Sequence, residues 1–98
     1  MPKGYVLAEV EVTDPAAFET YRGQVPATIA AYGGRYLVRG GETVRLEGDH
    51  PARRFVILEF DSPERASAWY YSEQYRPVKA LRLKSATTQL FLLSGVDG

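Results

Sequence analysis

Two dipeptides divide this chain into alternating strands and helices. Asp14-Pro15 and Ser62-Pro63 each place a capping side chain directly before a proline, an arrangement that favours the first turn of a helix. Runs rich in β-branched and aromatic residues, which indicate strands, precede and follow these helix starts. They lie at 5–12, 35–39, 53–60 and 86–93. The predicted order is therefore β-α-β-β-α-β.

The helices are predicted from their apolar periodicity. After Pro15, apolar side chains recur at steps of three and four residues until Gly33-Gly34, which is a strong stop signal. Pro26 falls inside this helix, so we expect a kink or break there. After Pro63, Trp69 lies on the inner stripe of the second helix. Ser72 is expected to cap a further, offset helical segment.

This order is that of an α+β, ferredoxin-like fold. We expect a four-stranded antiparallel sheet with the helices on one face, in a single domain that spans residues 1–98. Residues 43–47 are expected to remain extended and to finish the hairpin arm after the second strand.

Alternate residues of the strands form two sets of side chains, one for each face of the sheet, and both sets contain apolar residues. One set is assigned to the helix-covered face: Val6, Ala8, Val10, Val12, Tyr36, Val38, Val56, Leu58, Phe60, Leu90 and Leu92. The other set mixes apolar and polar residues: Tyr5, Leu7, Glu9, Glu11, Arg35, Leu37, Arg39, Phe55, Ile57, Glu59, Gln89, Phe91 and Leu93. Left in water, this second set would expose a large apolar patch, which monomers rarely tolerate. The pattern predicts a homodimer in which two sheets pack face to face as a dimeric α/β barrel.

Composition narrows the classes of partner and chemistry. Twelve Lys and Arg balance twelve Asp and Glu, so the net charge draws the chain neither to nucleic acid nor to an anionic membrane. The absence of cysteine excludes disulfides and thiol nucleophiles and suits a reducing cytoplasm. We expect a cytoplasmic protein without a signal peptide or a membrane span.

Glu59 and His50 are the candidate catalytic residues. Glu59 stands in an otherwise apolar strand, where burial would raise its pKa and make it a proton acceptor. The alternative is a structural ion pair with Arg35 or Arg39. His50 titrates near neutral pH but lies in a Gly-Asp-His-Pro turn with no second histidine, so a surface role is the alternative. Neither a metal nor a cofactor is expected.

The ligand-binding candidates are aromatic or cationic. Tyr21, Trp69 and Tyr75 could line a pocket for a flat molecule, although aromatic residues on helical stripes are most often core. Arg82, within the basic run 76–84, is the best single candidate for binding an anion, and Arg39 is an additional one.

Several segments resemble one known family. They are 32–41 (Tyr-Gly-Gly-Arg-Tyr-Leu-Val-Arg-Gly-Gly), 46–48 (Leu-Glu-Gly), 58–60 (Leu-Glu-Phe) and 68–75 (Ala-Trp-Tyr-Tyr-Ser-Glu-Gln-Tyr). They resemble domain of unknown function 1330 (DUF1330), which belongs to the dimeric α/β-barrel superfamily. The resemblance implies this fold and dimerisation but no established activity. Relatives in the superfamily include cofactor-free monooxygenases, haem-degrading enzymes and lactone isomerases that use a cleft between sheet and helices.

Three functions follow as hypotheses. In the first, a homodimer binds or transforms a small organic molecule in the sheet–helix cleft, as a cofactor-free oxygenase or isomerase does. In the second, the dimer is structural or regulatory and not catalytic. The third and weakest is a nucleic-acid module, because RNA-recognition domains share this topology. Glutamates on the sheet face that would bind RNA argue against it.

Overall fold

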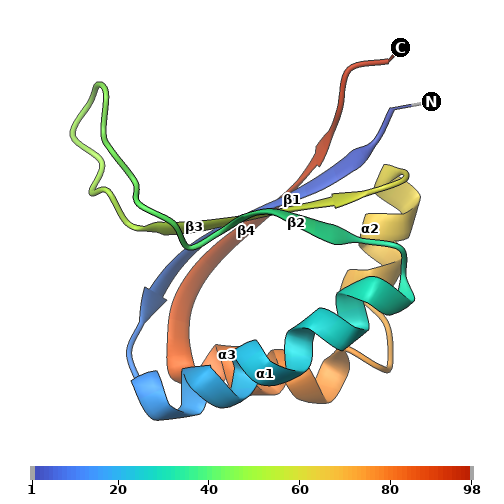
Figure 1. Ribbon diagram of the computed structural model, residues 1–98, viewed down its shortest axis with the longest axis horizontal. Helices are drawn as coiled ribbons and strands as arrows, with labels where there is room; N and C mark the ends of the chain where they lie inside the picture. Colours follow the sequence, from blue (N-terminus) through green and yellow to red (C-terminus); the bar gives the residue numbers. More distant parts are fainter. Residues whose placement is uncertain (1, 98) are drawn as a thin grey trace.

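A computed structural model describes residues 2–97 and confirms the ferredoxin-like fold (Figure 1). Along the chain the elements are β1 (Gly4–Val12), α1 (Pro15–Ala31), β2 (Arg35–Arg39), β3 (Arg54–Phe60), α2 (Pro63–Tyr70), α3 (Arg76–Ser85) and β4 (Ala86–Ser94). The second predicted helical region is thus two separate helices, which confirms the expected offset segment. No helix within residues 2–97 combines the length and hydrophobicity that crossing a bilayer requires.

The strands form one antiparallel sheet in the order β2-β3-β1-β4. All three helices lie on the same side of it (Figure 1). The second side, which we call the open face, is uncovered. Its apolar members include Leu37, Phe91 and Leu93, whose side chains are 46–55% exposed.

Two of the predicted caps hold helix starts in place. The backbone N–H of Ala17 donates to Asp14 Oδ1 at 3.2 Å, and that of Arg65 donates to Ser62 Oγ at 3.1 Å. These side chains satisfy backbone donors that have no partner inside their helices. The prediction that Ser72 caps the next helix was wrong, because α3 begins after Tyr75 without a side-chain cap. Ser72 Oγ accepts from the N–H of Tyr75 at 3.1 Å in the turn before that helix.

The break expected at Pro26 does not occur, because α1 runs without interruption from Pro15 to Ala31. Proline has no N–H, so the carbonyl of Arg22, four residues earlier, lacks its usual helical donor. The guanidinium of Arg39 donates to that carbonyl at 3.0 Å. A side chain from the sheet therefore replaces the missing helical hydrogen bond.

A β-bulge changes the expected faces of two residues in β2. Tyr36 lies opposite Leu58, but the next pairings are Val38 with Ile57 and Arg39 with Val56. One extra residue in a strand reverses the alternation of side chains beyond it. Val38 therefore turns to the open face and Arg39 to the helix-covered face, and both predicted assignments were wrong.

The segment after β2 also differs from the prediction. Residues 41–53 contain no strand, although 43–47 were expected to be extended and paired. They form an arm that projects from the sheet (the green loop in Figure 1). Its apolar residues Val44 and Leu46 are 67% and 94% exposed. These side chains contribute little packing, and the described contacts of this segment with the sheet are those of His50 with Glu9 and of Arg53 with Glu11.

The core lies between the sheet and the helices. Its largest fully buried side chains are Trp69, Tyr75, Phe60 and Ile29. Phe60 and Trp69 are in contact, with ring centroids 5.6 Å apart. Helices α1 and α3 lie against each other, and side chains fill the space between α1 and the sheet incompletely.

Replacing Gly34 by alanine is predicted to destabilise the protein. A Cβ at this position would lie 2.7 Å from Cζ of Phe60 and 2.8 Å from Cγ2 of Ile29, both in the tightly packed core. We expect the free energy of unfolding in urea to fall by about 1–3 kcal/mol. Gly23→Ala is the matched control, since nothing lies within 4 Å of its Cβ position. In mid-helix it should raise stability by about 0.5–1 kcal/mol. Equal effects of the two substitutions would contradict this packing.

Candidate functional site

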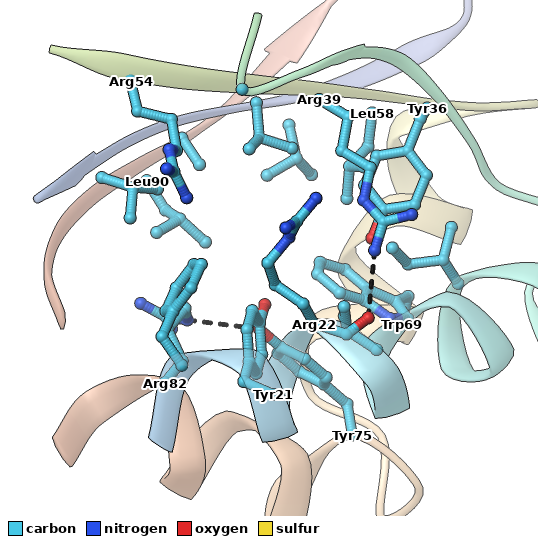
Figure 2. Close-up of a pocket in the computed structure, with 18 residues that line it drawn as sticks. Tyr21, Arg22, Tyr36, Arg39, Arg54, Leu58, Trp69, Tyr75, Arg82 and Leu90 are labelled. Carbon is cyan, nitrogen blue, oxygen red and sulfur yellow. Dashed lines mark hydrogen bonds between the residues drawn. The ribbon is translucent and has the colours of Figure 1, made fainter. Parts of the chain in front are cut away.

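A cavity of about 150 Å³ lies between α1 and the helix-covered side of the sheet (Figure 2). Most of its lining is apolar. The strands contribute aliphatic side chains: Val6, Ala8, Val10, Val56, Leu58 and Leu90. Helix α1 contributes Phe18, Val25 and Ile29. An apolar cavity with a few well-placed polar groups is the usual form of a small-molecule site.

A chain of polar side chains crosses the helical side of the cavity. The hydroxyls of Tyr21 and Tyr75 are 3.0 Å apart and share a hydrogen bond. Arg82 Nε donates to the Tyr75 hydroxyl at 3.3 Å, and Arg82 Nη1 donates to Thr88 Oγ1. Tyr75 is completely buried and Arg82 is only 4% exposed. These contacts join α1, α3 and β4 at one wall.

Tyr21 and Tyr36, two tyrosines of the cavity, are neutral hydrogen-bonding groups. Burial is the main cause that raises the pKa of Tyr21 far above its usual value, and the neighbouring Tyr75 adds to it. Burial also raises the pKa of Tyr36, against an opposing effect from Arg39. A phenol with a raised pKa keeps its proton at neutral pH. These side chains can therefore donate a hydrogen bond to a ligand but cannot act as bases.

Trp69 is held rigidly in the wall of the cavity. Its Nε1 donates to Thr28 Oγ1 at 3.0 Å, and that hydroxyl donates to the backbone carbonyl of Val25 at 2.8 Å. Its ring also packs on Tyr75, with centroids 4.3 Å apart. The indole N–H and the Thr28 hydroxyl each have a hydrogen-bond partner, so the flat indole ring is held in place beside the cavity.

All five predicted ligand-binding residues line this cavity: Tyr21, Arg39, Trp69, Tyr75 and Arg82. Their role in binding stays a prediction. Sequence reasoning missed two more arginines of the lining, Arg22 and Arg54. Arg54 could have been found, because it shares its strand side with Val56 and Leu58. No pattern in the sequence marked Arg22.

The two catalytic candidates lie outside the cavity. Glu59 forms an ion pair with Arg35 on the open face, as the structural alternative expected. A hydrogen bond to Glu59 is the main cause that raises the pKa of Tyr5. His50 belongs to the arm and contacts the carboxylate of Glu9. The structure therefore brings neither residue to the predicted ligand-binding group.

Similar structures share this fold. A protein of unknown function from Rhodopseudomonas palustris is 17% identical, with a TM-score of 0.76 over 99% of this chain and 85% of its own. SnoaB, a cofactor-independent oxygenase from Streptomyces nogalater, is 14% identical, with a TM-score of 0.65 over 100% and 97%. A dimeric ferredoxin-like protein of unknown function from Jannaschia sp. is 12% identical, with a TM-score of 0.67 over 93% and 97%.

At these identities the likeness shows the fold alone. No curated protein sequence matches the chain. The sequence model of one family, however, matches residues 3–96, which include every element of the sheet and every residue that lines the cavity. The chain therefore belongs to the DUF1330 family, a domain of unknown function.

Proposed function

We propose that this protein is a homodimer that binds a small organic molecule in the cavity between α1 and the sheet. The observation that carries the proposal is the cavity itself. Its aliphatic floor, the fixed Trp69 ring and the Tyr21–Tyr75 pair combine apolar contact with directed hydrogen bonding. The two hydroxyls share a single hydrogen bond, so one of their two phenolic hydrogens remains available to an oxygen atom of a ligand.

The catalytic form of this proposal is a cofactor-free oxygenase or isomerase. Its support is the similar fold of SnoaB, described as a cofactor-independent oxygenase. In this form the neutral phenol of Tyr21 acts as hydrogen-bond donor to the oxygen on which charge develops. The lining described within residues 2–97 contains no carboxylate and no imidazole. A substrate for this site would therefore have to arrive already deprotonated.

The same observation favours a second candidate, a dimer that binds its ligand without transforming it. Binding needs only the shape and the donors of the cavity, whereas proton abstraction needs a base within hydrogen-bond reach. Glu59 and His50 are the bases that the sequence suggested, and both lie on the other side of the sheet. Measuring oxygen uptake and product formation with any ligand found would separate the two candidates.

The homodimer is supported by the open face. Apolar side chains from all four strands lie exposed or partly exposed on it, including Leu7, Leu37, Phe55 and Phe91. Its glutamates already have partners: Glu59 pairs with Arg35, Glu11 pairs with Arg53 at 2.6 Å, and Glu9 contacts the imidazole of His50. Paired charges can be covered at lower cost than isolated ones. A second copy of the chain, packed sheet against sheet, would remove this surface from water.

Ligand binding can be followed through Trp69, the only tryptophan of the chain. We expect at least one member of a panel of small acids, phenols and lactones to quench its fluorescence and to raise the melting temperature. Ala8→Leu should abolish both effects, because it fills the cavity from its floor. Ala68→Leu, at an exposed position of α2, is the control and should leave both unchanged. A panel without any binder, or one that binds the Ala8→Leu variant equally well, would refute the proposal.

Sedimentation velocity tests the dimer. We expect the wild-type protein to sediment as two chains, and Phe91→Lys to sediment as one because it places an unpaired charge in the apolar face. Ala80→Lys introduces the same side chain at an exposed position of α3 and should remain a dimer. A wild-type protein that stays monomeric at high concentration would rule the dimer out.

A further inference from the structure

Four arginines from four different elements converge on the cavity. Arg22 comes from α1, Arg39 from the end of β2, Arg54 from the start of β3 and Arg82 from α3. Figure 2 shows Arg39 and Arg54 reaching down from the sheet toward Arg22, which rises from α1. Guanidinium groups keep their charge under all ordinary conditions. Like charges gathered around one space repel one another unless water or an opposite charge screens them. Arg39 and Arg54 are exposed and Arg22 is partly exposed, whereas Arg82 is buried.

The protein supplies no such opposite charge within the cavity. Among residues 2–97, neither Arg39, Arg54 nor Arg82 forms an ion pair, and no acidic residue lines the cavity. Arg22 contacts Glu19 at 3.3 Å, but that carboxylate is 70% exposed on the surface of α1. On the open face Arg35 and Arg53 do have carboxylate partners. Cations elsewhere that also form no ion pair within residues 2–97, such as Arg65 and Lys84, are exposed to water, whereas Arg82 is buried.

Arg82 is the strongest single indication. It is 4% exposed, yet the described contacts of its guanidinium are with two neutral hydroxyls, those of Tyr75 and Thr88. Hydroxyls satisfy donor geometry but do not balance a charge. Buried charges in proteins are normally paired with an opposite charge. A bound anion would balance this charge.

The volume and the apolar lining of the cavity indicate what the ligand is like apart from its anionic group. A cavity of about 150 Å³ has the volume of engineered cavities that hold benzene. Most of the lining is aliphatic or aromatic, which favours an apolar body over a fully hydrated inorganic ion. The planar fork of arginine matches a carboxylate, which it can bind through two parallel hydrogen bonds.

We infer that the cavity recognises a small organic carboxylate with an apolar body of about one ring. The arginines hold the carboxylate, and the ring lies between the strand floor and Trp69. This inference rests on the proposed ligand binding in the same cavity and adds the charge and the size of the ligand to it.

The test compares benzoate with benzamide, which has the same ring and shape but no charge. Binding is measured at constant ionic strength by titration calorimetry and by Trp69 fluorescence. We expect benzoate to bind at least about tenfold more tightly than benzamide. Arg82→Gln should reduce benzoate affinity by about tenfold or more, and the more exposed Arg54→Gln by at least about threefold. Neither variant should change benzamide affinity.

Arg76→Gln is the matched control. Arg76 lies on α3 like Arg82, pairs with Glu73 at 2.7 Å and is outside the cavity, so benzoate affinity should not change. Arg54→Gln keeps the test decisive if Arg82→Gln does not fold, because Arg54 is exposed and forms no ion pair within residues 2–97.

Each other outcome has a distinct meaning. Equal affinity for benzoate and benzamide would overturn the inference and leave ligand binding in the cavity intact. Inorganic phosphate that binds as tightly as benzoate would overturn the organic part of the inference. If benzoate, benzamide and phosphate all fail to bind, and no member of the panel of small acids, phenols and lactones binds either, the proposed function itself would be overturned.

Discussion

The backbone carbonyl oxygen of Arg22 accepts no hydrogen bond from within α1, and a contact at the edge of the cavity replaces that missing hydrogen bond. Pro26 removes the helical donor, and the guanidinium of Arg39 donates to this carbonyl across the gap between the sheet and α1. Arg39 can reach that carbonyl because the bulge in β2 has already turned it toward the helices. One hydrogen bond thus fixes the position of a cavity arginine and replaces a missing helical contact.

Local sequence signals predicted the framework of this structure well. The Asp14-Pro15 and Ser62-Pro63 caps and the β-branched runs gave the order of elements, because capping and strand propensity act over a few residues. The helical stripes placed Tyr21 and Trp69 on inward faces for the same reason. The predictions that were wrong depended on contacts between segments that lie far apart in the sequence. The continuity of α1 through Pro26 needs a donor from β2, and no periodicity within α1 reveals such a donor.

The candidate site was predicted in part, and one residue was included for the wrong reason. Arg39 was expected on the open face, since regular alternation places it there, and only the bulge brings it to the cavity. The net charge of zero did not reveal the cationic lining of the cavity. Arginines of the open face pair with carboxylates, whereas those of the cavity are mostly unpaired within the described chain. A total charge carries no information about such segregation, which arises only when the strands and helices are assembled.

The bulge makes the polarity of the cavity a matter of strand register as well as of residue type. If β2 paired with β3 without the bulge, strict alternation from Tyr36 would turn Val38 toward the helices and Arg39 away from them. Deleting the unpaired Leu37 would instead leave both side chains on the faces that they occupy now, because the pairings of Val38 and Arg39 would not change. The sheet order and the helix caps would not need to change in either case, because the arm that follows β2 contains no strand. A shift of one residue in the register of this strand is thus a route by which one scaffold could exchange a cationic lining for an aliphatic one.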